Sequence, residues 1–180
     1  MNHTDHVNLL RPASLPPCSH WADLGAGSGA FTLALRELLG SASDIHAVDK
    51  DQLRLTELQR SWQSRFGDVS HLHLHPADFT RLLDLPPLDG VLMANSLHFF
   101  KDKQPVLRHV QSLLKPGGAL LLVEYNVDTG NTWVPHPLSF ETWRTLAPKA
   151  GFSEPRQLAT ASSSFLRGFY SALAYYTQRG

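Results

Sequence analysis

Three alternating glycines between a short apolar strand and a helix constrain this chain more than any other feature. The strand is expected over residues 21–24, the glycines are Gly25, Gly27 and Gly29, and the helical pattern follows at once. Glycines at such a turn let the backbone approach a ligand closely, and the new helix points its free N–H groups at the same place. Asp49 ends a second apolar strand about twenty residues later, where a carboxylate can accept hydrogen bonds from ribose hydroxyls. The pattern indicates an α/β protein that binds a nucleotide-type cofactor.

The rest of the chain continues the alternation of strands and helices. Further strands are expected at residues 45–48, 71–75, 90–94 and 119–125, and helices at 29–39, 52–65 and 103–114. After a helix over 139–150, two strands at 157–163 and 169–177 follow without a helix between them, which is typical of an antiparallel hairpin. The pattern predicts a parallel sheet with helices on both faces, closed at one edge by that hairpin.

Length and composition favour a single soluble globular domain. The chain has 180 residues, and its 16 basic residues balance 16 acidic ones, so no charge excess points to nucleic acid or a membrane surface. The only cysteine, Cys18, cannot form an internal disulfide, and no signal peptide or membrane-spanning run is evident, so we expect a cytoplasmic protein. Residues 1–19 are polar and proline-containing, and predict an arm with at most a short helix at 7–10, before one domain over 20–180.

Four further segments accompany the glycine loop in a fixed order. They are Ala47-Val48-Asp49, Pro76-Ala77-Asp78-Phe79, the stretch from Asp89 to Phe99, and Leu114-Lys115-Pro116-Gly117-Gly118 with the apolar strand after it. Together they resemble the motifs of the class I S-adenosylmethionine-dependent methyltransferases, over residues 21–177. The resemblance implies a Rossmann-like three-layer sandwich, with a seven-stranded, mostly parallel sheet in the order 3-2-1-4-5-7-6 and an antiparallel C-terminal hairpin.

The resemblance also implies S-adenosylmethionine as cofactor and assigns residues to it. Asp49 would hold the ribose diol with Lys50 beside the adenine, Asp78 would contact the adenine amino group, and Asp23 would lie near the methionine moiety or brace the glycine loop. Asp78 has a local alternative, because an aspartate after a proline in a loop often closes an Asx-turn or caps a helix. The candidate cofactor-binding residues are Asp23, Gly25, Ala26, Gly27, Gly29, Asp49, Lys50, Asp78, Phe79 and Asn95.

The candidate acceptor pocket follows the fourth and fifth strands. Ligands of such sheets bind at the carboxyl ends of the strands, where Ser96, His98, Tyr125 and Trp133 are expected. His98 is the candidate catalytic base, since an imidazole titrates in the useful range, although a histidine packed on its phenylalanine neighbours is an equal alternative. Glu124 either faces the same pocket or braces a neighbouring loop.

Three alternate histidines, His71, His73 and His75, would share one face of the third strand. Three histidines on a face can bind zinc, but no partner acid or cysteine is evident and we expect a strand covered on both sides. We therefore predict surface or helix-covered histidines and no metal.

The predicted function is methyl transfer from S-adenosylmethionine to a small-molecule acceptor. The chain lacks the Asn-Pro-Pro-Tyr type segment of many amino-group methyltransferases, which disfavours nucleic acid. Methylation of RNA or protein and a non-catalytic cofactor-binding module stay open as alternatives. An NAD-dependent oxidoreductase is disfavoured because its Gly-x-Gly-x-x-Gly spacing is not met. The residue 1–19 arm, the loop 126–137 or a second subunit of a homodimer are the candidates for closing the pocket.

Overall fold

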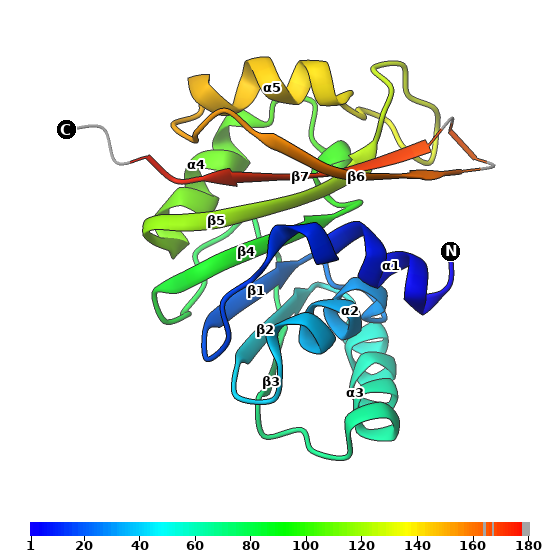
Figure 1. Ribbon diagram of the computed structural model, residues 1–180, viewed down its shortest axis with the longest axis vertical. Helices are drawn as coiled ribbons and strands as arrows, with labels where there is room; N and C mark the ends of the chain where they lie inside the picture. The colour runs from blue at the N-terminus through cyan, green and yellow to red at the C-terminus, as the bar shows by residue number, and fades with distance from the viewer. Residues whose placement is uncertain (164, 167, 178–180) are drawn as a thin grey trace.

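A seven-stranded sheet lies between two layers of helices in the computed structural model, which describes residues 1–163, 165–166 and 168–177 (Figure 1). The strand order is β3-β2-β1-β4-β5-β7-β6, with β7 antiparallel to both β5 and β6, and the remaining neighbours parallel. The predicted fold class and strand order are confirmed. The strands are β1 (His20–Leu24), β2 (Asp44–Asp49), β3 (Leu72–Pro76), β4 (Leu88–Ala94), β5 (Leu114–Tyr125), β6 (Arg156–Ser162) and β7 (Gly168–Tyr175).

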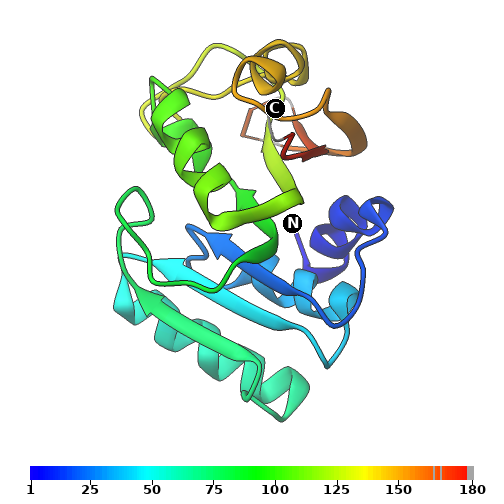
Figure 2. The same cartoon turned by 90° about the vertical axis from the view of Figure 1, so that its left-hand side faces the viewer.

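Each face of the sheet has its own core and its own helices. The α-helices are α1 (His3–Leu10), α2 (Ala30–Leu39), α3 (Gln52–Phe66), α4 (Gln104–Leu113) and α5 (Phe140–Lys149). Buried residues of α1 and α2 pack with Trp21 and Ile45 on one face, whereas those of α4 and α5 pack with Val91 and Tyr170 on the other. Figure 2 shows α4 and α5 on the opposite side of the sheet from α2 and α3. The two layers leave the ends of the strands open for a site.

The N-terminal segment forms more structure than the sequence predicted. A capping box between Asn2 and Asp5 starts α1, a 3₁₀ turn over Arg11–Ala13 follows, and Leu9 and Leu10 are buried in the core. The hydroxyl of Ser171 on β7 donates a 2.6 Å hydrogen bond to the carbonyl of Leu9. This segment therefore packs as part of the core, against α2, β6 and β7.

The histidine-bearing strand β3 lies at the edge of the sheet, as the predicted strand order requires. It is not covered on both sides as we expected, and its histidines include the predicted surface histidines. Residues 77–87, which join β3 to β4, contain no helix, so no helix of that connection covers this face. The side chains of His71 and His73 are 38% and 40% exposed, and both contact the carboxylate of Asp44, at 3.2 and 2.8 Å. Polar histidines tolerate this position because water reaches them. Elsewhere, the described residues contain no helix long and apolar enough to cross a membrane.

Candidate active site

The glycine loop joins β1 to α2 in a conformation that only glycine adopts readily. Gly25 and Gly29 have φ values of +84° and +88°. A side chain at Gly25 would also press on Ser96, and one at Gly29 would overlap Leu58 of α3. The amides of Gly25 and Ala26 donate to the carbonyl of Val48, at 2.8 and 3.1 Å. The loop is thereby fixed against the end of β2.

Asp49 ends β2 and organises both loops beside it. One carboxylate oxygen accepts a 2.8 Å hydrogen bond from the amide of Gly27, and the other accepts a 2.9 Å bond from the amide of Asp51. Each oxygen has a further lone pair, so the half-buried carboxylate keeps capacity for ligand hydroxyls. The geometry suits the ribose-binding role expected for Asp49.

Asp23 braces the loop from below. Its carboxylate is 1% exposed and accepts a 2.6 Å hydrogen bond from the hydroxyl of Thr32, in the first turn of α2. Burial raises the pKa of Asp23 from 3.8 to about 7; the Thr32 bond opposes this shift and the nearby charge of Asp49 adds to it. The contact ties β1 to α2 across the glycine loop, which is one of the two roles expected for Asp23.

Two buried polar atoms after β4 have no hydrogen-bond partner among the described residues. They are the side-chain oxygen Oδ1 of Asn95 and the hydroxyl of Ser96, next to Gly25. Asn95 also holds a strained φ of +54° while its amide donates to the carbonyl of Val123. Buried polar groups in folded proteins are nearly always satisfied, so these two atoms fit a site completed by a polar ligand. With the glycine cradle and Asp49, they fit S-adenosylmethionine.

Among the candidate cofactor-binding residues, those expected to contact the adenine are the most exposed. Asp78 accepts hydrogen bonds from the amide and hydroxyl of Thr80, at 2.9 and 2.7 Å, and these bonds lower its pKa. That is the local turn raised as its alternative role, and it leaves the second carboxylate oxygen 3.8 Å from Arg81. The ring of Phe79 packs edge-on to Phe100, at 5.7 Å between centroids. Lys50 is exposed, and its charge also lowers the pKa of Asp78.

His98 forms a buried pair with Glu124. Nδ1 of His98 lies 2.9 Å from one carboxylate oxygen of Glu124, and the amide of His98 donates to the other at 3.0 Å. His98 is 3% exposed and Glu124 is fully buried. Since a carboxylate only accepts, this bond assigns the hydrogen to Nδ1, and in the neutral imidazole the lone pair is then on Nε2. Nε2 has no hydrogen-bond partner in the part of the chain that the structure describes.

Aromatic side chains surround this pair. Phe99 lies 4.4 Å from the His98 ring and is 59% exposed, and Tyr125 lies 6.1 Å from it. Burial raises the pKa of the Tyr125 hydroxyl. Trp133 is 74% exposed in the loop after β5, which the carboxamide oxygen of Asn131 shapes by accepting from two amides. The amide of His136, in the same loop, donates to the carbonyl of His98 at 2.9 Å, so the two loops are joined.

Two contributors were missed or left undecided by sequence reasoning. Glu124 was an open choice between pocket and brace, and its partner lies 26 positions away in the chain. Lys103, at the start of α4, was not singled out, yet it is 9% exposed and donates to the carbonyls of Phe100 and His136, both at 2.9 Å. The sequence feature that could have identified Lys103 is its place at the start of a helix, where a cation is unfavourable because it opposes the helix dipole.

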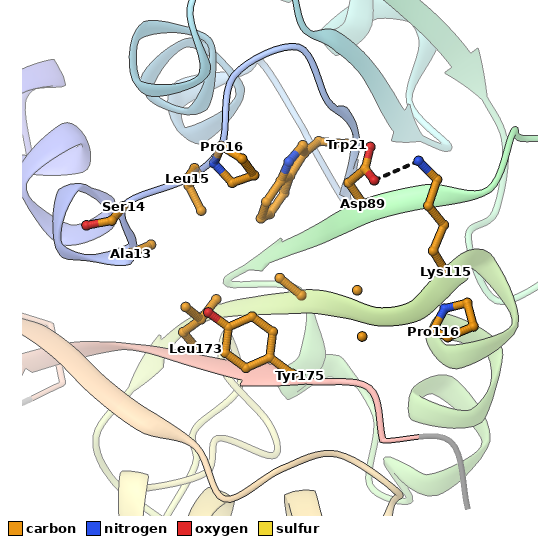
Figure 3. A pocket seen from close by; sticks show the side chains of 13 residues that line it. Ala13, Ser14, Leu15, Pro16, Trp21, Asp89, Lys115, Pro116, Leu173 and Tyr175 are labelled. Carbon is orange, nitrogen blue, oxygen red and sulfur yellow. Dashed lines mark hydrogen bonds and ion pairs between the residues drawn. The ribbon is translucent and has the colours of Figure 1, made fainter.

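A separate cavity of about 260 Å³ lies at the amino ends of the central parallel strands, away from the glycine loop (Figure 3). Trp21, Leu173 and Tyr175 line it, and the ion pair between Asp89 and Lys115, 2.6 Å long, lies at its side. It collects the starts of β1, β4 and β5, whereas the glycine loop and His98 follow strand ends. Among the described residues, no group of three or more histidine, cysteine or acidic side chains could hold a metal ion.

The strand order and the glycine loop with Asp49 define a class I S-adenosylmethionine-dependent methyltransferase fold. The family model described as "Methyltransferase domain" matches residues 22–120, and the chain belongs to this family. It is therefore a methyltransferase domain whose cofactor is S-adenosylmethionine.

Individual relatives extend the comparison. An arsenite methyltransferase of Aquipseudomonas alcaligenes is 34% identical over 129 residues, covering 67% of this chain and 36% of that protein. Fumosorinone synthetase of Cordyceps fumosorosea is 33% identical over 110 residues, covering 57% of this chain and 3% of the synthetase. The structure of the CurJ carbon methyltransferase superposes with a TM-score of 0.76 at 22% identity, covering 99% of this chain and 54% of that one. The chain thus spans about a third of the first relative and a small part of the second.

Proposed function

We propose that this domain transfers a methyl group from S-adenosylmethionine to an acidic carbon of a small acyl-type acceptor, after His98 has removed a proton from that carbon. The observation that carries the proposal is the buried His98–Glu124 pair beside the orphaned oxygens of Asn95 and Ser96. A histidine base is not needed to methylate a free neutral amine, whereas a carbon acid must lose its proton first.

The proton transfer follows from the geometry of the pair. Glu124 holds the imidazole with the hydrogen on Nδ1, so the lone pair of Nε2 is the base. When Nε2 takes the proton, the positive charge forms beside a buried carboxylate that stabilises it. The carbon keeps the electron pair of the broken C–H bond, and uses it to form the bond to the methyl carbon. The imidazolium then returns its proton to water.

Other residues would bind the cofactor. When bound, S-adenosylmethionine supplies an electrophilic methyl group on a positively charged sulfur and departs as the neutral thioether S-adenosylhomocysteine. Asp49 would hold its ribose, and the glycine loop with Asn95 and Ser96 would hold the remainder. Residues around the reaction centre align the acceptor with the methyl carbon and exclude water, which supplies much of the rate.

An imidazole base also matches the acidity of such an acceptor. A carbon between two carbonyl groups loses its proton to an imidazole far more readily than an alkyl alcohol does. The structural similarity to CurJ, a carbon methyltransferase, supports a carbon acceptor. The exposed rings of Phe99 and Trp133 offer an apolar surface for a small, neutral chain.

Arsenite is the second candidate, raised by the relative from Aquipseudomonas alcaligenes. Trivalent arsenic is a soft centre that takes thiolate ligands. These 180 residues contain one cysteine, Cys18. It is exposed and precedes β1, at the opposite end of that strand from the glycine loop. The donor set therefore favours the carbon acid.

The test is a turnover assay with methyl-labelled S-adenosylmethionine and a panel of acceptors: a β-ketoacyl thioester, a phenol, an amine and arsenite. We expect labelled thioester, with the new methyl on the carbon between the carbonyls. His98→Ala should lower turnover by about 10²–10⁴-fold while the affinity for S-adenosylhomocysteine stays the same. Labelled arsenite or amine with an inactive thioester, or full activity of His98→Ala, would overturn the proposal.

A further inference from the structure

Lys103 carries a buried charge that binding of the cofactor does not explain. Its side chain is 9% exposed, and its ammonium group donates 2.9 Å hydrogen bonds to the carbonyls of Phe100 and His136. Phe100 belongs to the loop after β4 and His136 to the loop after β5. One ammonium group therefore joins the two loops that hold the candidate acceptor pocket.

Holding a cation at this position is costly. Removing an ammonium group from water is unfavourable unless hydrogen bonds or an opposite charge compensate. No carboxylate lies within 4.0 Å of the Lys103 nitrogen among the described residues, and the positive end of the α4 dipole is adjacent. Burial accordingly lowers the pKa of Lys103, although the charges of Glu124 and Asp128 oppose that shift. A purely structural tie could be made by a neutral side chain.

The two carbonyl bonds connect Lys103 to the catalytic pair. His136 accepts from Lys103 through its carbonyl and donates through its amide to the carbonyl of His98, at 2.9 Å. His98 in turn donates to Glu124. Hydrogen bonds to the backbone of His136 and His98 thus link Lys103 to the carboxylate, and the charges of Lys103 and Glu124 also interact through space.

We infer that Lys103 is a positioning residue that holds the His98–Glu124 pair in register by joining the loop after β4 to the loop after β5. The inference rests on the proposed function of His98.

The hydrogen bonds of Lys103 act on the catalytic pair and not on the cofactor cradle. Losing them should therefore lower kcat while the affinity for S-adenosylhomocysteine stays the same. A side chain that keeps N–H donors should restore part of kcat.

Two variants separate the hydrogen bonds from the charge. Lys103→Met removes both, whereas Lys103→Gln keeps N–H donors without the charge and serves if the methionine variant does not fold. Lys101→Met is the matched control, because Lys101 is exposed in the same loop. Each protein is assayed with S-adenosylmethionine and the β-ketoacyl thioester across pH, together with S-adenosylhomocysteine affinity.

We expect kcat of Lys103→Met to fall about tenfold to a hundredfold, as for other residues that hold a catalytic group in place. Lys103→Gln, which keeps N–H donors, should recover part of that loss. S-adenosylhomocysteine affinity should change by less than about twofold, and Lys101→Met should behave as the wild type. Wild-type kcat of Lys103→Met, an equal loss of kcat in Lys103→Gln, or a parallel loss of S-adenosylhomocysteine affinity would overturn the inference. If His98→Ala itself retains full turnover, the proposed function fails instead.

Discussion

Asp23 shows how burial of a single residue couples this site to pH. Burial raises its pKa from 3.8 to about 7, so the folded protein keeps a proton that the unfolded chain has released. Between these values the unfolded state binds fewer protons, and the free energy of unfolding must fall as pH rises. The contribution is fully present below about pH 4 and lost above about pH 7.

Replacing the carboxyl group with a neutral amide should remove this dependence. Between pH 4 and 7.5 the wild type should lose up to about 4 kcal/mol of unfolding free energy, and Asp23→Asn should not. Urea unfolding at both pH values measures the difference, with Asp84→Asn, an exposed carboxylate, as control. Equal pH slopes for the wild type and Asp23→Asn would contradict the assignment.

The roles of single residues could be predicted from the sequence to different extents. Asp49 was found because its distance from the glycine loop is set by one helix and one strand, so chain spacing carries the information. The pairing of His98 with Glu124 depends on β4 and β5 lying side by side, since each residue follows or ends one of those strands. Only the strand register, which spacing does not encode, brings them together.

At the scale of elements, α1 was read as part of an arm because prolines follow it closely. Its apolar residues instead complete the core beside α2 and β7. Leu10→Ala should therefore lower the free energy of unfolding by about 2–5 kcal/mol, because it leaves a cavity at a fully buried side chain. Chemical denaturation measures this, with Leu53→Ala, 78% exposed, expected to change little. A loss equally small at Leu10 would show that α1 does not support the core.

The β2–β3 pair should make the protein sensitive to acid. Burial, with the charges of His73 and His75, lowers the pKa of His46 from 6.5 to about 4, and its Nδ1 lies 3.0 Å from Nε2 of His75. The unfolded chain therefore binds the extra proton between pH 6.5 and 4, so stability falls as pH falls through that range. The groups facing His46 are His20, Asp44, His71, His73 and His75.

His46→Gln should retain about 3 kcal/mol of unfolding free energy that the wild type loses between pH 6.5 and 4. Thermal or urea unfolding across that range provides the measurement, and His109→Gln on α4 is the control. If acid destabilises His46→Gln as much as the wild type, another group is responsible.

The same face shows why element-scale prediction stopped short. Alternation of strands and helices correctly predicted the sheet, but it carried no information on residues 77–87, which cross from β3 to β4 without a helix. Polar histidines are tolerated on β3 because that face remains exposed to solvent. Their pattern was visible in the sequence, whereas the missing cover was not.

At the scale of the whole molecule, the fold divides labour between two neighbouring regions. The ends of β1 and β2 supply the cofactor cradle, and the ends of β4 and β5 supply His98, Glu124 and the loops that Lys103 joins. The order of five motifs predicted this arrangement and the cofactor. The acceptor was not predictable, because it is defined by loops of differing sequence rather than by the shared strands.

The proposed removal of a proton by His98 is tested most directly by exchange of the acceptor's acidic proton with solvent. The enzyme is loaded with S-adenosylhomocysteine, which carries no methyl group to transfer, and given a β-ketoacyl thioester in deuterated water. We expect enzyme-dependent deuterium uptake at the carbon between the carbonyls, abolished in His98→Gln and strongly reduced in Glu124→Gln. Uptake that persists in His98→Gln at the wild-type rate, or no uptake above the uncatalysed reaction with the wild type, would contradict the proposal.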